Sequence, residues 1–345
     1  MFPLDNSMGH HHIQYVHTEN DDMAQHFLLS AKARTLSLAK VLRLSDEEAH
    51  EAFKAVRWAE NGGEPVCPKC GSVEVYTFKA RRIFKCKGCG SQFSLTSGTI
   101  FASRKLAIRD ILAAIAIFTN GAKGYSALQL SRDLDVQYKT AFVLAHKIRE
   151  SLTALSKTVT LSGVVEIDGA FFGGHIKPRN YKENRRDRRL KTNQTGKRKC
   201  VVVMRERGGR TLTQVVRSEA QGVPVVMARV ANGSVIHADE ASHWDALHAH
   251  YDMKRINHSF AYSHDGACTN MAESFFSRLR RAELGTHHHI RRRYLASYAG
   301  EMAWREDQRR ESNGTQYSMI LHAATHHPVS RQWKGYWQRG VTAGT

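Results

Sequence analysis

The 345-residue sequence lacks two kinds of segment that would place it in a membrane or outside the cell. No stretch approaches the roughly 18 apolar residues of a membrane helix. The longest candidate, 108–118, is too short and is interrupted by Arg109 and Asp110. The N-terminus has no basic region followed by an apolar segment, so no secretion signal is expected. We therefore expect a cytoplasmic protein with reduced cysteines and no membrane partner.

Acidic residues are scarce relative to basic ones. The chain has 32 Asp and Glu against 51 Lys and Arg, a net charge of +19. Such an excess favours binding to phosphate backbones, because a basic surface releases the counterions of the phosphates when it binds. The affinity gained in this way does not depend on base sequence. The segment 177–199 holds eleven basic and two acidic residues, or +9 of the total, and 278–293 holds six arginines against Glu283. Solvated faces are the alternative for both runs. The overall balance predicts a polyanionic partner, with nucleic acid favoured over a membrane surface.

Only six cysteines occur, and four of them form two pairs with the spacing C-x2-C-x15-C-x2-C. Two thiolates two residues apart on a tight turn can bind one ion, and the glycine after each pair permits the positive φ of that turn. Disulfides are disfavoured in a reducing compartment, and a redox site needs only one pair. With short strands between the pairs, the pattern predicts a zinc ribbon. One structural Zn²⁺ would be bound by Cys67, Cys70, Cys86 and Cys89.

Two cysteines lie outside these pairs, and several helices are expected before residue 158. Cys200 and Cys268 are expected to be buried free thiols. A capping box at 45–48 predicts a helix toward residue 58, and 105–120 predicts an apolar helix. Two short helices, from 126 and over 137–152, are separated by about three residues and suit a helix-turn-helix. The second would present its first residues to a DNA groove, namely Gln137, Lys139 and Thr140. A plain helical hairpin is the alternative.

The second half is organised around the segment 163–174. Residues 164–172 are apolar and aromatic-rich with a glycine at each end, which predicts a buried strand. Side chains alternate along a strand, so Glu166 and Asp168 share one face. A carboxylate there is costly unless a cation, a proton or hydrogen-bond donors compensate it. A metal ligand and a sheet-edge carboxylate bonded to loop amides are both open at this point.

Further strands and helices follow this segment. Strands are expected at 200–206, 211–217, 234–238 and 254–257, and helices at 222–230, 242–250 and 269–282. This order is the ribonuclease H-like arrangement, whose chemistry needs acidic residues in the first strand, after the fourth and on a late helix. Asp168, Asp239 and Glu273 occupy these places. Carboxylates gathered on a central sheet can hold two Mg²⁺ (or Mn²⁺) ions about 3.5–4 Å apart.

Several motifs together resemble one family. CPKCG…CKGCG, EIDGAFFGG, HADE and TNMAESFFSRLRR, followed by GTHHH and EMAWR, are similar to a bacterial insertion-sequence transposase of the DDE superfamily. The resemblance is to the branch with an N-terminal zinc ribbon and an ISXO-like catalytic domain, and it covers about residues 58–310. It implies a DNA transposase that binds element ends and cuts and joins strands by hydrolysis and transesterification. The expected partner is double-stranded DNA, at the element ends and at the target, and the expected form on DNA is a homodimer or higher oligomer.

The resemblance also implies site residues. Asp168 and Asp239 would be the two aspartates, with a third ligand on the late helix and a basic residue seven positions beyond it. Arg280 holds that position relative to Glu273, and residues i and i+7 share a helix face. One departure is Gly169, which stands where family members commonly have an acidic residue.

The third ligand is the open question among these residues. Some relatives use asparagine, so Asn270 competes with Glu273. The pair also fits a capping box, in which Asn270 caps the helix and Glu273 bonds back to its amide. On that interpretation Glu273 is structural.

The expected architecture is a multidomain α/β protein with a ribonuclease H-like mixed-sheet core. The expected parts are a helical region (1–62), a zinc ribbon (63–98), a helix-turn-helix domain (99–158), the catalytic domain (159–315) and a tail (316–345). Residues 177–199 are expected to be an arm that orders on DNA, with contacts from Arg185, Arg186, Arg188 and Arg189. The alternatives are a transposase-derived DNA-binding protein without catalysis, and a metal-dependent nuclease or resolvase without strand transfer.

Overall fold

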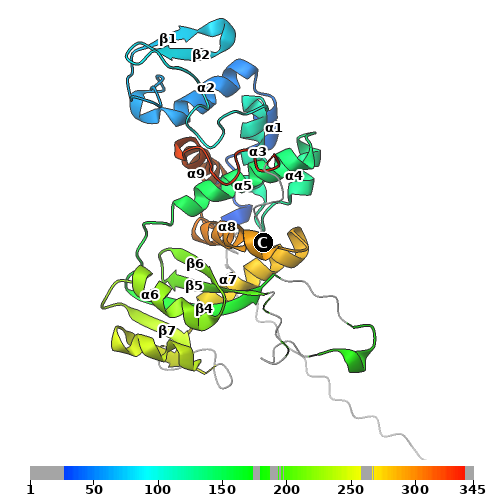
Figure 1. Cartoon of the computed structure of the whole chain (residues 1–345), viewed down its shortest axis with the longest axis vertical. Coiled ribbons are helices and arrows are strands. Elements are labelled where there is room, and N and C mark those ends of the chain that lie inside the picture. Colours follow the sequence, from blue (N-terminus) through cyan, green and yellow to red (C-terminus); the bar gives the residue numbers. More distant parts are fainter. Residues whose placement is uncertain are drawn as a thin grey trace, which may run out of the picture.

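The structure is a computed structural model, and it describes residues 27–173, 179–186, 193, 196, 198–257, 266 and 268–338. Figure 1 shows a three-stranded hairpin sheet and a group of helices at one end of the long axis, and a larger sheet covered by helices at the other. No helix in this part of the chain has the length and apolar content needed to span a membrane.

The small sheet packs beside the first helices. These elements are α1 (Leu38–Leu42), α2 (Asp46–Arg57), β1 (Val75–Phe78), β2 (Ile83–Cys86) and β3 (Gln92–Ser94). The strands are antiparallel in the order β1-β2-β3. The predicted capping box is confirmed: Ser45 Oγ accepts from the Glu48 amide at 3.1 Å, and the Glu48 carboxylate accepts from the Ser45 amide at 2.7 Å. The sheet is joined to α2 by an edge-to-face contact of Trp58 with Phe84.

Three helices follow, and a fourth joins them from the far end of the chain. They are α3 (Ile108–Asn120), α4 (Ala127–Asp133), α5 (Tyr138–Ala154) and α9 (Asn313–His326). One apolar core unites α2, the small sheet, α3, α5 and α9. The Asn313 carboxamide also accepts hydrogen bonds from the amides of Thr35 and Leu36, at 2.9 and 2.8 Å. The expected start of a C-terminal tail at 316 therefore falls inside a packed helix.

The large sheet has the strand order β6-β5-β4-β7-β8. Its strands are β4 (Val164–Phe172), β5 (Lys199–Glu206), β6 (Thr211–Val216), β7 (Val235–Asp239) and β8 (Asp252–Ile256). The first three pair antiparallel, whereas β7 is parallel to β4 and β8 is parallel to β7. The predicted ribonuclease H-like mixed sheet is confirmed.

Helices cover both faces of this sheet (Figure 1). On one face α6 (Val223–Arg229) and a 3-10 helix, Ser242–Ala249, pack against Val165 and Ile167 of β4. On the other face α7 (Asn270–Arg281) and α8 (Leu295–Asp307) pack against Ala170 and Phe172. Because side chains alternate, Glu166 and Asp168 lie on the α7 face, as the sequence predicted. The shorter helical turns are Phe27–Leu29, Ala31–Ala33, Ala59–Asn61, Lys79–Arg81, Lys182–Asn184, Glu219–Gly222, Ala282–Thr286 and Arg292–Tyr294.

Candidate active site and metal centre

The four paired cysteines meet at one point of the small sheet. The Sγ atoms of Cys67 and Cys89 are 3.7 Å apart, those of Cys70 and Cys86 are 3.5 Å apart, and all four lie within 4.8 Å of one another. A tetrahedral zinc ion with Zn–S bonds of about 2.3 Å separates its sulfurs by about 3.8 Å. The cluster therefore fits one structural Zn²⁺, with no position left for a substrate.

The turns that carry these cysteines have the expected backbone. Gly71 and Gly90 have φ of 75° and 68°, where an L side chain is strained. In the second turn the Cys89 amide also donates to Cys86 Sγ at 3.4 Å. Each turn thus aims two thiols at the same point.

The acidic residues named by the sequence gather at the large sheet. Asp168 lies on β4, Asp239 ends β7, Glu273 lies in the first turn of α7 and Arg280 two turns later. Burial raises the pKa of Asp168 to about 7, and the negative charges of Asp239 and Glu273 add to this effect. The Gly169 amide, 2.6 Å from Asp168 Oδ1, and the Arg280 guanidinium act in the opposite direction. Charged groups on β7 and α7 therefore act on Asp168 of β4, although the three elements are separate in the sequence.

These carboxylates are less tightly grouped than the cysteines. Within the described residues, the cysteine cluster alone has three or more ligand atoms that all lie within 4.8 Å of one another. Like charges repel when no cation lies between them. The oxygen donors are of the type that Mg²⁺ and Mn²⁺ prefer, so the donor set fits divalent cations that would draw it together.

A fourth carboxylate, which the sequence did not indicate, belongs to this site. Glu219 begins the turn Glu219–Gly222 after β6, and a Cβ atom on Gly169 would overlap its carboxylate. Burial raises the pKa of Glu219 to about 7, with contributions from the charges of Asp168 and Asp239. On the outer side, His243 Nε2 lies 3.7 Å from Glu219 Oε2. A glycine inside a buried strand is typical of a site where another group comes close to the backbone. Gly169 was therefore the one feature of the sequence that could have indicated the position of Glu219.

Glu166 fixes the start of α7 against β4. Its carboxylate is fully buried and accepts from the amides of Met271 at 2.8 Å and Ala272 at 3.3 Å. It also pairs with Arg207 Nε at 3.0 Å. A carboxylate at a helix N-terminus accepts hydrogen bonds from the free amides and interacts favourably with the positive end of the helix dipole. Glu166 thereby holds the turn that carries Glu273 beside Asp168, two residues along the same strand.

This arrangement decides the capping question. The N-cap of α7 is Thr269 and has no side-chain cap hydrogen bond, whereas Asn270 is the first helical residue. The capping-box interpretation of Asn270 and Glu273 is therefore wrong, because Glu166 satisfies the amides from outside the helix. Asn270 is exposed and Glu273 is half-buried.

Arg280 lies at the edge of the site. Its guanidinium carbon is 5.8 Å from the Phe172 ring centre and 5.9 Å from that of Phe276. With Lys123 and Arg281 it lines a hollow of about 540 Å³. Three cations around one opening suit a phosphate group.

The comparisons with known proteins agree with this geometry. Residues 160–307 match the ISXO2-like transposase domain, and residues 44–92 match the transposase zinc-ribbon domain. The chain carries an ISXO2-like transposase domain after a transposase zinc ribbon.

One curated relative extends this result. An uncharacterized protein in transposable element ISH50 of Halobacterium salinarum is 30% identical over 156 residues, which are 44% of this chain and 51% of the relative. The chain thus spans about half the length of the curated relative it matches. This relative is haloarchaeal, so it does not test the expected bacterial origin. No solved structure matches the chain.

The predicted DNA-reading residues lie at the start of α5. Gln137 is the N-cap residue, and Lys139 and Thr140 are exposed in the first turn. The break before this helix has Asp135 at φ 50°. The C-terminal segment lies against the same turn: the Trp337 indole donates to the Lys139 carbonyl at 3.3 Å. A second part of the chain therefore covers part of the surface that was predicted to enter a groove.

The predicted basic arm belongs to the transposase domain, between β4 and β5. Arg185 and Arg186 are exposed, and Arg185 donates to the carbonyls of Arg179 and Asn180, both at 3.2 Å. Arg188 and Arg189 lie outside the described residues.

The two remaining cysteines differ from each other. Cys200 is buried on β5, as expected. Cys268 is only half-buried, and Arg207 donates to its sulfur at 2.6 Å, so the expectation of a buried thiol is wrong there.

Proposed function

We propose that this protein is a DNA transposase that cuts and joins DNA strands at its acidic site by phosphodiester hydrolysis and transesterification. The observation that carries the proposal is the gathering of Asp168, Asp239 and Glu273 around β4 within the ISXO2-like transposase domain. Two Mg²⁺ (or Mn²⁺) ions bound there would supply an activated nucleophile and a stabilised leaving oxygen.

Different residues of the acidic site have different roles in binding the metal ions. Asp168, Asp239 and Glu273 hold the ions, and Glu219 adds a fourth carboxylate in the space that Gly169 leaves open. Asn270, exposed one turn before Glu273, is the second candidate for the third ligand. These side chains bring oxygen atoms to the central strand β4 and its surroundings from four separate elements.

Two further residues position the reaction. Arg280, with Lys123 and Arg281 around the adjoining hollow, binds a phosphate of the strand being cut. Glu166 holds the first turn of α7 and so fixes the distance between Glu273 and Asp168.

DNA is held mainly by the rest of the chain. The zinc ribbon (63–98) and the helix-turn-helix (99–158) bind the ends of the element, with Gln137, Lys139 and Thr140 in contact with DNA. The basic arm adds backbone contacts through Arg185, Arg186, Arg188 and Arg189, which are independent of base sequence. The protein works as a homodimer or higher oligomer on DNA in the cytoplasm, at the nucleoid.

Two other functions use parts of the same structure. A transposase-derived DNA-binding protein would not need the gathered carboxylates, which are costly to bury together. A nuclease or resolvase would cut but would not join strands. The chain's geometry favours catalysis over DNA binding alone, and a joining assay separates a transposase from a nuclease.

The test is a cleavage and strand-joining assay with labelled terminal inverted repeats taken from the DNA that flanks the gene. Asp168→Asn and Asp239→Asn should abolish both steps in Mg²⁺ and leave DNA binding nearly intact. Folding should not suffer, because removing one negative charge relieves repulsion. Glu240→Gln is the matched control, since this exposed residue adjoins Asp239 and should cut like the wild type. Cleavage by either aspartate variant at the wild-type rate would show that the active site lies elsewhere.

The role of Glu219 needs a measurement other than activity. Glu219→Gln should weaken Mn²⁺ binding, measured by electron paramagnetic resonance on the intact protein, while leaving the melting temperature unchanged or slightly higher. Unchanged Mn²⁺ affinity would remove Glu219 from the proposed ligands.

A further inference from the structure

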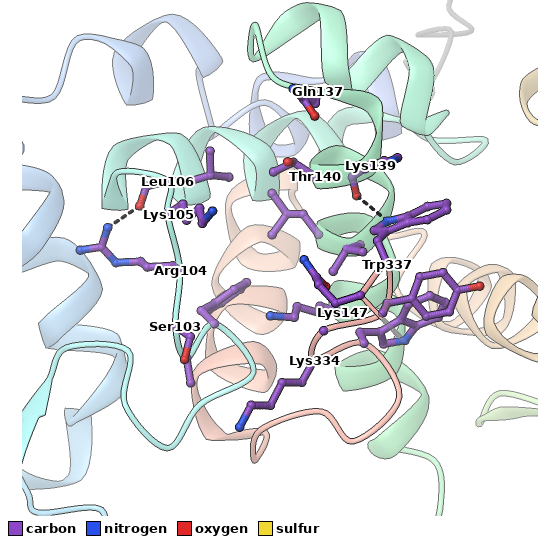
Figure 2. A pocket seen from close by; sticks show the side chains of 18 of the residues that line it. Ser103, Arg104, Lys105, Leu106, Gln137, Lys139, Thr140, Lys147, Lys334 and Trp337 are labelled. Atoms are coloured by element: carbon purple, nitrogen blue, oxygen red, sulfur yellow. Dashed lines mark hydrogen bonds between the residues drawn. The ribbon is translucent and has the colours of Figure 1, made fainter. Parts of the chain in front are cut away.

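A basic and aromatic pocket lies far along the chain from the acidic site. It has a volume of about 390 Å³ and forms where the loop 101–106, the start of α5 and the segment 333–338 meet (Figure 2). Five cationic residues line it, and no lining residue is acidic: Arg104, Lys105, Lys139, Lys147 and Lys334. Such a pocket is within the usual size range for a small-ligand site, about 300–1,000 Å³.

The cations differ in how they face the pocket. Figure 2 shows Lys147 reaching from α5 into the hollow, while Arg104 turns back to bond the carbonyl of Leu106. Lys147 is half-buried, and this burial lowers its pKa. The negative charge of Glu150 acts in the other direction and raises the pKa. An ammonium withdrawn from water in a pocket without carboxylates is suited to an anion.

The aromatic wall is held in place by several contacts. Trp333 is buried and stacks on His146, with ring centres 4.3 Å apart. Tyr336 forms a hydroxyl–hydroxyl hydrogen bond of 2.5 Å with Tyr294. Trp337 bonds the Lys139 carbonyl and lies 5.5 Å from its ammonium group, and 44% of its surface is exposed. The segment 333–338 is therefore an anchored part of the pocket, with an aromatic face left at the rim.

We propose that this pocket binds one unpaired nucleotide of a DNA strand, with its phosphate between Lys105 and Lys147 and its base against Tyr336 and Trp337. Proteins that bind single strands combine a cationic groove with aromatic platforms, because every base has a stacking face. A base inside an intact duplex is stacked on both sides and cannot reach a wall of this kind. The occupant is therefore a strand end or a nucleotide extruded from the duplex. This inference rests on the proposed function only in taking DNA as the substrate.

The first experiment measures binding of a fluorescent single-stranded oligonucleotide to the full-length protein. Removing both lysine contacts to this one phosphate should flatten the dependence of log K on log salt by about 0.7, the contribution of one neutralised phosphate on a single strand. Lys105→Gln/Lys147→Gln should accordingly lose about tenfold in single-strand affinity at moderate salt, with duplex affinity within about twofold of wild type. Lys157→Gln, an exposed lysine of the same region outside the pocket, is the matched control and should change neither affinity.

The second experiment tests stacking with 2-aminopurine in the same oligonucleotide. Its fluorescence should be quenched on binding to wild type and to Trp337→Phe. Trp337→Leu should lose most of the quenching and about tenfold in affinity, in line with the loss of one base–aromatic stack. Thymidine monophosphate added as competitor separates a free nucleotide from a strand: it should displace the oligonucleotide only at far higher concentration.

Each outcome decides something different. Equal losses for duplex and single strand would show a general backbone contact and overturn the proposal, as would unchanged single-strand binding in both pocket variants. If wild type binds and quenches the single strand but cuts no element end, the transposase proposal fails and the pocket stands. If wild type cuts ends but the pocket variants behave like wild type, the pocket proposal alone fails.

Discussion

The two candidate metal centres are built in opposite ways. The four cysteines come from two short turns within one small sheet, and their sulfurs already lie within 4.8 Å of one another. The four carboxylates come from β4, β7, α7 and the turn after β6, and they remain more widely spaced. Local turn chemistry is enough to arrange the first centre, whereas the second exists only when a whole sheet has assembled. Loss of one ligand should therefore abolish the cysteine centre and leave the large sheet folded. Substitutions around the carboxylate centre should instead reduce its function to different extents.

The largest expected effect comes from breaking the local centre. Cys67→Ser should release the zinc ion and unfold the ribbon, because metal binding of about 10–16 kcal/mol supplies most of the folding energy of such a module. Zinc content by mass spectrometry and proteolysis of residues 63–98 measure this. The sheet β4–β8 should stay folded, since its cores do not include the ribbon.

Cys200→Ala is the control for this experiment. Its thiol is buried in the large sheet, so the variant should keep one zinc ion per chain. Purified wild type without zinc, or with disulfides between the paired cysteines, would contradict the assignment.

The next effect concerns the third ligand of the distributed centre. Glu273→Gln should weaken Mg²⁺ binding and cut cleavage steeply, because an amide oxygen replaces a charged ligand. Asn270→Ala should change the rate less, since Asn270 is exposed at the helix start. Both variants should melt near the wild-type temperature, because the carboxylate of Glu166 accepts from the first amides of α7 and is unchanged in both.

The comparison between these two variants is made across a Mg²⁺ titration. Normal cleavage by Glu273→Gln together with loss of cleavage in Asn270→Ala, both folded, would transfer the role to Asn270.

The smallest expected effect comes from Glu166, which holds the start of α7 in place. Glu166→Gln keeps the shape of the side chain but removes the charge that pairs with Arg207 and receives two amides of α7. Because Arg207 is 34% exposed, we expect a loss of about 2 kcal/mol rather than the full cost of a broken buried pair. Denaturant unfolding measures the loss, and Glu74→Gln, at an exposed site, is the control.

Glu166→Gln should also reduce cleavage, though less than Glu273→Gln does. An unchanged free energy of unfolding would show that the buried carboxylate contributes nothing to the position of α7.

The same contrast explains what the sequence could predict. Cysteine spacing and glycine turns are short-range patterns, so the zinc ribbon followed from them and is confirmed. The order of strands and helices was also sufficient for the large sheet, because buried apolar runs and their connections limit the topology. The roles of Asp168, Asp239 and Glu273 stay predictions that the geometry supports.

Long-range packing was not predictable from such patterns. Glu219 lies in a polar turn with no motif around it, and only Gly169, 50 positions earlier, marked the space it fills. The contact of Trp337 with the start of α5 joins parts of the chain separated by 198 positions. No local signal showed that the final helix would pack beside the first ones.

The return of α9 to the N-terminal core has a consequence for synthesis on the ribosome. The large sheet, from β4 to β8, is complete in the nascent chain before residues 313–326 emerge. The core shared by α2, α3 and α5 therefore stays incomplete until residues 313–326 are made, because Ile320, Leu321 and Ala324 of α9 belong to it. A ribosome that stops before residue 313 therefore leaves a chain with a finished large sheet and an unfinished N-terminal core.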